Sequence, residues 1–226
     1  MEPRESRLLA ALSERARTEL LHSAVSRRLR RGSILFLAGE ESNRLYVMKS
    51  GVVKLSHRRI DGRELMLGLA VPGDLVGEIE AFESRPHELD AIAGCPGEAL
   101  GLDATCFRRA VTTEPAALRT LVSILGRRCR ALSAMLQERN ATVVQARLAG
   151  KLLHMALLLG REDCGALEFE LPLRQADIAS FAGTSRESVS KILKRFERDG
   201  LLQCRGHKLR IVHPEALERI RCAGRA

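Results

Sequence analysis

Hydrophobic residues follow two different patterns along the chain, and the change between them falls near residue 113. Before this point, short apolar runs alternate with glycine and with turn pairs such as Asp61-Gly62 and Pro72-Gly73. Short apolar runs separated by glycine-rich turns are typical of the strands of a β-barrel or sandwich. The pattern therefore predicts an all-β region over residues 30–102, with strands at residues 34–37, 45–48, 52–55 and 64–69.

A long amphipathic helix is predicted over residues 114–140, with Pro115 in its first turn. Its apolar residues recur at steps of 4, 3, 4, 3 and 4, which is the spacing of a left-handed coiled coil. They are Leu118, Val122, Leu125, Cys129, Leu132 and Leu136. This stripe predicts the seam of a parallel dimer, and the alternative is a helix packed on its own β domain. A second helix is predicted over residues 144–159, after a hinge at residues 140–142.

Residues 175–196 have the pattern of a helix-turn-helix motif. Gly183 stands at the turn between two predicted helices, and Ala179 is small where these helices must cross closely. Ser185 is a cap-type residue before the second helix, and Val189 continues the apolar face of that helix. Such a motif holds the second helix rigidly, so that its N-terminal turn can enter the major groove of DNA.

Charged and polar residues cover the outward face of this second helix. Arginine and lysine can donate to guanine and glutamate can accept from cytosine, so its first turns are predicted to contact base edges. The base-contacting candidates are Arg186, Glu187, Ser190 and Lys191. The phosphate-contacting candidates are Thr184, Ser185, Lys194, Arg195, Arg198, Arg205 and Lys208, the last two on a basic hairpin predicted within residues 201–212 as a wing. The alternative is a solvated amphipathic helix of mixed charge.

The net charge agrees with a nucleic-acid partner. The 226 residues include 37 Lys+Arg and 28 Asp+Glu, a net charge of +9. This surplus alone is weak evidence, because many proteins carry such a charge for solubility. Aromatic residues make up only 3% of the chain, so few rings are present on which the bases of a single-stranded nucleic acid could stack. Double-stranded DNA is therefore the expected partner.

The cysteines and histidines predict neither a metal site nor an enzyme. The six cysteines are scattered without a C-x-x-C pair, and no H-E-x-x-H, G-x-S-x-G or P-loop motif occurs. No signal-like segment opens the chain, and its longest apolar stretch, residues 152–159, is well short of the roughly 20 residues that cross a bilayer. We expect a cytoplasmic protein without membrane association or catalytic activity. Cys164 and Cys204 are candidates for a thiol redox sensor, although a structural role is the default.

The helix-turn-helix residues resemble those of the Crp/Fnr superfamily of bacterial transcription regulators, and the resemblance covers nearly the whole chain. Residues 184–193 look like the family's recognition helix, where an Arg-Glu pair and a later basic residue contact a TGTGA-like half-site. Here Lys191 stands where Arg is more usual, which predicts softer discrimination at that base. The segments Pro72-Gly73-Asp74 and Gly77-Glu78 are similar to parts of the family's cyclic-nucleotide-type β-roll. The resemblance implies an α+β chain with three parts: an effector-type β-roll with an N-terminal helix (1–113), a dimerisation helix (114–140) and a winged helix-turn-helix (141–226).

The predicted effector pocket departs from the family pattern. Gly77 and Glu78 match the Gly-Glu pair whose glutamate holds the ribose of a cyclic nucleotide, but His87 and Glu88 stand at or beside the Arg-Ser pair that neutralises its phosphate. A carboxylate about 4 Å from a phosphate costs roughly 4 kcal/mol at an effective dielectric constant near 20. Further pocket candidates implied by the resemblance are Arg85, Arg128, Leu132 and Ser133. We therefore do not expect cyclic AMP to be the effector. The sequence does not identify another one.

The leading hypothesis is a homodimeric regulator that binds a near-palindromic operator. Activation of transcription would need a surface for RNA polymerase, and the segment Arg161-Glu162-Asp163 is a candidate, predicted as a loop. Two alternatives belong to other classes. One is a signalling module that responds to a cyclic nucleotide or cyclic dinucleotide, and the other is a thiol redox-sensing regulator.

Overall fold

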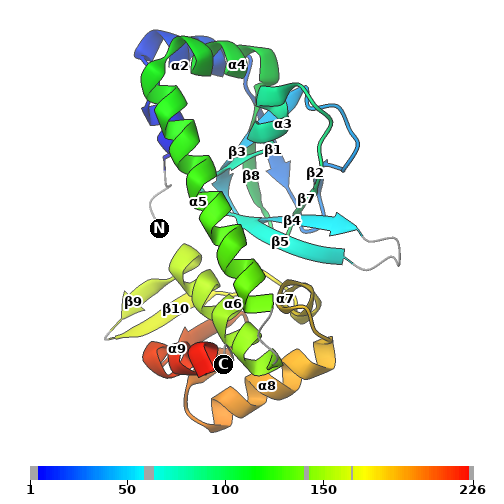
Figure 1. Cartoon of the computed structure of the whole chain (residues 1–226), viewed down its shortest axis with the longest axis vertical. Helices are drawn as coiled ribbons and strands as arrows, with labels where there is room; N and C mark the ends of the chain where they lie inside the picture. Colours follow the sequence, from blue (N-terminus) through cyan, green and yellow to red (C-terminus); the bar gives the residue numbers. More distant parts are fainter. Residues whose placement is uncertain (1–4, 59–63, 140–142, 164, 224–226) are drawn as a thin grey trace. The chain divides into compact units, whose positions relative to one another are not determined.

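The computed structural model describes residues 5–58, 64–139, 143–163 and 165–223 (Figure 1). They form two compact units, Met1–Arg130 and Ala131–Ala226. The predicted hinge at residues 140–142 and the redox candidate Cys164 lie outside the described residues.

The first unit begins with two short helices, α1 (Arg7–Ala10) and α2 (Glu14–His22). Ser13 caps α2, because its hydroxyl accepts a hydrogen bond from the Ala16 backbone N–H at 3.3 Å. The strands of this unit follow: β1 (Val25–Leu29), β2 (Ile34–Phe36), β3 (Arg44–Ser50), β4 (Val53–Arg58), β5 (Glu64–Ala70), β6 (Leu75–Val76), β7 (Asp90–Ala93) and β8 (Gly97–Asp103).

These strands pair into two antiparallel sheets, in the orders β1-β8-β3-β6 and β2-β7-β4-β5. Met48 and Ala99 from the first sheet pack with Phe36, Val53 and Ala91 from the second, and all five are buried. One shared core between two antiparallel sheets is the arrangement of a β-sandwich or β-roll. The predicted strands are therefore confirmed, but residues 30–102 are not all β, because they also contain a short helix, α3 (Glu78–Glu83).

Two glycines allow the first sheet to come close to the turn between β3 and β4. Gly51 has a φ of +76°, and a Cβ added there would lie 2.6 Å from the Pro96 carbonyl oxygen. A Cβ added to Gly97 would lie 2.2 Å from the Ser50 carbonyl oxygen. Any larger residue at either position would displace backbone, so these glycines are required by close packing.

Three further helices complete the first unit: α3 (Glu78–Glu83), α4 (Ala104–Thr113) and the long helix α5 (Pro115–Arg139), whose last residues belong to the second unit. A second core lies between these helices, α1, α2 and one sheet. It is formed by buried residues such as Leu8, Leu20, Leu45, Phe107 and Leu121. Figure 1 shows α2 and α4 side by side near the start of α5.

The second unit contains α6 (Val144–Leu159), β9 (Arg161–Asp163), β10 (Ala166–Glu170), α7 (Gln175–Ala182), α8 (Arg186–Arg198), β11 (Leu202–Arg205), β12 (Lys208–Ile211) and α9 (Pro214–Ala223). Its sheet has the order β11-β12-β10-β9. Leu148, Ile178, Val189, Phe196 and Leu217 come from four different helices, and none of them has any exposed surface. These helices therefore share one core.

The prediction of a loop at Arg161–Asp163 is wrong, because these residues form strand β9 and pair with β10. Three charged residues have low strand propensity, but an edge strand tolerates them when its side chains face solvent. All three are exposed, and Asp163 also accepts a hydrogen bond from the Arg210 guanidinium on β12 at 2.9 Å.

None of the helices in the described ranges is both long and apolar enough to span a bilayer. Across residues 5–58, 64–139, 143–163 and 165–223, no group of three or more His, Cys, Asp or Glu side chains is placed to hold a metal ion.

Candidate DNA-binding and effector sites

The turn between α7 and α8 has the conformation that a helix-turn-helix motif requires. Gly183 ends α7 with a φ of +62°, in the left-handed region that glycine adopts most easily. The backbone N–H of Thr184 then donates to the Ala179 carbonyl oxygen at 2.9 Å. Ser185 caps α8, because its hydroxyl accepts a hydrogen bond from the Ser188 N–H at 3.1 Å. The turn predicted from Gly183 and Ser185 is confirmed.

Arg147, which sequence reasoning missed, holds this turn from α6. Its Nε donates to the Ala182 carbonyl oxygen at 3.0 Å, and its Nη2 donates to the Gly183 carbonyl oxygen at 3.2 Å. The last carbonyl groups of a helix have no partner within the helix, and a cation is favourable beside them. Arg147 therefore fixes the end of α7 and, through it, the start of α8.

Helix α8 is strongly amphipathic. Its inward residues Val189, Leu193 and Phe196 are buried, whereas Arg186, Glu187 and Lys191 are exposed and Ser190 is half-buried. The four base-contacting candidates thus lie within the first two turns of a helix anchored along its opposite face. A backbone N–H and the Ser185 hydroxyl hold the pKa of Glu187 below its usual range, so this carboxylate is ionised and only accepts hydrogen bonds.

The phosphate-contacting candidates differ in whether their side chains already interact with other residues of the protein. Lys194 is exposed, whereas Arg195 lies 3.6 Å from Asp199 and donates to Gln145 at 3.3 Å. Arg198 lies 3.8 Å from Asp199. Thr184 is half-buried, and the Ser185 hydroxyl is used in the cap. Lys194 is therefore the candidate on α8 whose ammonium group is most available to a phosphate.

The predicted basic hairpin is present as β11 and β12. Arg205 and Lys208 face each other at the end of the ladder, on either side of the Gly206-His207 turn. Both side chains are exposed. Two cations at the tip of a hairpin beside a recognition helix suit a wing that contacts the DNA backbone.

In the first unit, the predicted effector residue Glu78 is fully buried at the start of α3. Its Oε1 atom lies 2.6 Å from Nη1 of Arg128 on α5, whose Nη2 donates to the Leu75 carbonyl oxygen. Neither carboxylate oxygen of Glu78 accepts a hydrogen bond from the residues that the structure describes. Burial raises the pKa of Glu78 above its ordinary value, although the Arg128 charge acts in the opposite direction.

His87 is also buried, and its ring stacks on that of Phe36 with a centroid distance of 3.5 Å and an interplanar angle of 7°. Both rings pack against Gly77, where an added Cβ would lie 2.8 Å from His87 Cε1. His87 therefore fills space next to the Gly77-Glu78 pair, and Phe36 is a member of this cluster that the sequence did not indicate.

The other predicted pocket residues do not join this cluster. Arg85 and Glu88 are exposed, and Arg85 lies 3.8 Å from Glu88 and 3.7 Å from Glu83. Leu132 and Ser133 are exposed and belong to the second unit. The structure thus brings together Gly77, Glu78, His87 and Arg128, and it places Arg85 among surface carboxylates.

The predicted seam on α5 is largely exposed. The exposed fractions are 40% for Leu118, 62% for Val122, 47% for Leu132 and 65% for Leu136. Cys129 is also exposed, and Leu125 is half-buried. The same helix buries Ala117 and Leu121 against its own β domain. The helix therefore packs on its own β domain through one face and leaves the predicted seam exposed on another.

Two domain families match the chain. Residues 26–114 match the cyclic nucleotide-binding domain, and residues 146–220 match the Crp-like helix-turn-helix domain. The chain is 34% identical over 189 residues to the "CRP-like cAMP-activated global transcriptional regulator" of Mycobacterium tuberculosis, which covers 84% of each protein. It is 28% identical to the "Cyclic AMP receptor protein" of Thermus thermophilus, over 76% of each protein.

Solved structures show the same fold. FixK2 from Bradyrhizobium japonicum superposes with a TM-score of 0.78 at 22% identity, over 87% of this chain and 96% of that one. A CRP family transcriptional regulator from Thermus thermophilus superposes with a TM-score of 0.72 at 29% identity, over the same shares of the two chains.

The β-roll, the long helix and the winged helix-turn-helix define a DNA-binding transcription regulator with a cyclic nucleotide-binding-type domain. The chain belongs to the Crp/Fnr family of transcription regulators. The relatives named above are regulators and not enzymes.

Proposed function

We propose that this regulator acts in the cytoplasm as a homodimer and binds a near-palindromic operator through α8. Arg186, Glu187, Ser190 and Lys191 contact base edges, whereas Lys194 and the hairpin cations Arg205 and Lys208 contact phosphates. The observation that carries this proposal is the exposed, charged first half of α8 on a helix whose opposite face is buried. A contact with RNA polymerase belongs to the proposal, with exposed strand β9 as its candidate surface.

The exposed seam of α5 supports the homodimer. Apolar side chains at coiled-coil spacing lose contact with water when two such helices pair. A two-fold dimer presents its recognition helices about one DNA turn apart, roughly 34 Å. Its operator must then contain two inverted half-sites.

Selection of bound fragments from a random pool of duplex DNA tests this function. We expect enrichment of inverted half-sites whose centres are about 10 base pairs apart. Enrichment of a single half-site or of direct repeats would contradict the dimer, and no enrichment at all would contradict sequence-specific binding.

We also propose that the β-roll does not take cyclic AMP as its effector. Two features support this: Glu78 is already paired with Arg128, and His87 packs beside Gly77. Calorimetry with cyclic AMP, cyclic GMP and cyclic dinucleotides tests the proposal. No heat with cyclic AMP is expected, and saturable micromolar binding of cyclic AMP would overturn it.

A further inference from the structure

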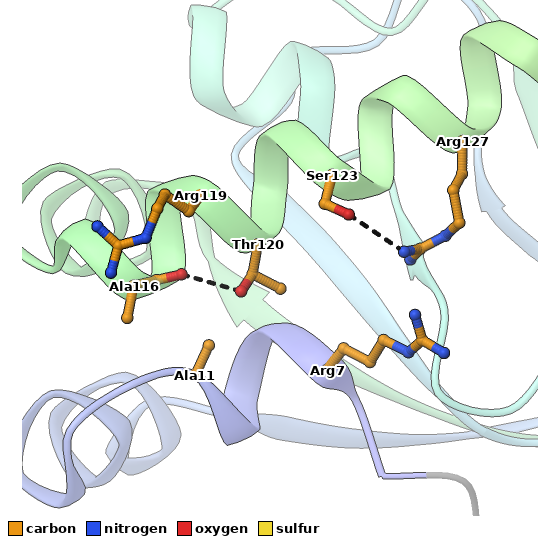
Figure 2. A pocket seen from close by; sticks show the side chains of 7 residues that line it. All are labelled: Arg7, Ala11, Ala116, Arg119, Thr120, Ser123 and Arg127. Atoms are coloured by element: carbon orange, nitrogen blue, oxygen red, sulfur yellow. Dashed lines mark hydrogen bonds between the residues drawn. The ribbon is translucent and has the colours of Figure 1, made fainter.

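A groove lies between α1 and α5 in the first unit (Figure 2). Its volume is about 440 Å³, and it is widely open to solvent. Arg7 comes from α1, and Arg119 and Arg127 come from α5. Figure 2 shows Arg7 and Arg127 reaching toward the same end of the groove, with Arg119 at the other end.

Within the described ranges, no acidic side chain neutralises the three guanidinium groups. No carboxylate within the described residues forms an ion pair with Arg7, Arg119 or Arg127. The only side-chain partner of Arg127 there is the Ser123 hydroxyl, which accepts from its Nη1 at 3.4 Å. Three uncompensated cations around one concave surface repel one another and attract a counter-ion. The groove is therefore electropositive, with no carboxylate partner among the residues that the structure describes.

The hydroxyl groups in the groove also suit an anion. Thr120 donates its proton to the Ala116 carbonyl oxygen at 2.9 Å, whereas the Ser123 oxygen accepts from Arg127 and keeps its own proton available for a ligand. The remaining lining is the side chains of Ala11 and Ala116. The lining contains no aromatic ring on which a base could stack and no carboxylate that could hold a ribose. Phosphate oxygens are the groups that this lining can bind.

The groove and the dimer seam occupy different faces of α5. At 100° per residue, Ser123 and Arg127 lie about 140° and about 180° around the helix from Leu118, whereas Arg119 lies about 60° from Val122, at the edge of the seam. Ala117 and Leu121 lie on the other side of the seam and face the β domain. A dimer formed through the seam therefore leaves the end of the groove at Arg7 and Arg127 open to solvent, with Arg119 beside the seam.

We propose that this groove binds a small molecule with a polyphosphate chain, with Arg7 and Arg127 holding one end of the chain and Arg119 the other. Such a ligand joins α1 to α5. Because α5 also carries the seam, the ligand would act as a regulatory input separate from the β-roll pocket. Guanidinium groups bind phosphate oxygens through short, charge-assisted hydrogen bonds.

Isothermal calorimetry on the full-length protein tests the proposal, with inorganic tripolyphosphate and ATP as probes at fixed ionic strength. Each of the variants Arg7→Gln, Arg119→Gln and Arg127→Gln should weaken tripolyphosphate binding about tenfold, which is the loss of one charge-assisted hydrogen bond. The matched control is Arg28→Gln, which removes the same charge from an exposed position on β1 and should change binding less than twofold. Equal affinities for the two probes would assign recognition to the phosphate chain alone, and tighter ATP binding would add the nucleoside.

Three results would overturn the proposal. They are no binding of either probe by the wild-type protein, an equal loss in Arg28→Gln, and weaker operator binding by the groove variants in the absence of polyphosphate, which would assign the groove to DNA. The three arginines lie at the surface, so we expect the variants to fold. Unchanged thermal unfolding temperatures of the variants would confirm this. Operator affinity of the wild-type protein without polyphosphate is measured separately, which distinguishes failure of this site from failure of the proposed DNA-binding function.

Discussion

The carboxylate of Glu78 lies 2.6 Å from the guanidinium of Arg128, and this ion pair joins the first turn of α3 to the long helix α5. Glu78 is fully buried, whereas 31% of the Arg128 side chain is exposed. Removing a carboxylate from water is costly, and one partly solvated cation offsets only part of that cost. The ion pair therefore connects the β-roll to the helix with the dimer seam without strongly stabilising either.

Stability should change with pH through Glu78. Burial raises the pKa of Glu78 in the folded protein above 4.5, its value in an unfolded chain. Below that pH both states are protonated, and as the pH rises the unfolded chain ionises first, so the folded state loses stability until Glu78 itself ionises. In urea unfolding, Glu78→Gln should therefore gain stability relative to wild type between pH 4 and pH 7.

Glu83→Gln is the matched control, because Glu83 lies on the same helix but is exposed. Its stability relative to wild type should stay nearly constant over this range. A Glu78→Gln difference that is flat or falls with pH would contradict the assigned direction of the pKa shift.

The seam predicts how a single charge affects assembly. In a parallel dimer, Val122 faces its own copy across the two-fold axis, so Val122→Glu places two carboxylates together in an apolar interface. We expect the dimer dissociation constant to rise by at least about tenfold, measured by analytical ultracentrifugation. Ala131→Glu, exposed on another face of α5, should leave it unchanged. An unchanged constant for Val122→Glu would place the interface elsewhere.

Cys204 should be a poor redox sensor. Burial and the Glu197 carboxylate raise the pKa of its thiol from 9.0 to about 11. The thiolate is the reactive form, so its population at pH 7.5 falls by about a factor of 100. Cys204 and Cys222 are both exposed. Because of the raised pKa of its thiol, iodoacetamide should label Cys204 far more slowly than Cys222, and Glu197→Gln should speed the reaction. Labelling of Cys204 at the rate of Cys222 would restore the redox hypothesis for this residue.

Local signals account for the parts of the fold that the sequence predicted well. The bounds of α6 agree with the predicted helix at residues 144–159, and α7 begins at Gln175 as expected. Gly183 and Ser185 specify their turn through a positive φ and a cap, which depend on neighbouring residues only. Such features can be derived from short stretches of sequence.

Contacts between distant segments account for what was missed. Strand β4 continues to Arg58, beyond the predicted end at residue 55, because Ser56, His57 and Arg58 pair with β5. Because the side chains of these three residues are polar, a search for apolar runs does not find this part of the strand. In the effector region, the stack of His87 on Phe36 joins residues far apart in the chain, and Arg7 meets α5 only in the folded unit. No local motif contains this information.

The central claim is that the first turns of α8 contact bases while Lys194 contacts only the backbone. Operator and random-sequence affinities of Arg186→Ala and Lys194→Ala, measured by fluorescence anisotropy at one salt concentration, test it most directly. Arg186→Ala should lose about 1–3 kcal/mol on the operator, lose much less on random DNA, and relax the preference at one base pair of each half-site. Lys194→Ala should weaken binding to both DNAs by similar factors. Equal losses on operator and random DNA for both variants would contradict the account.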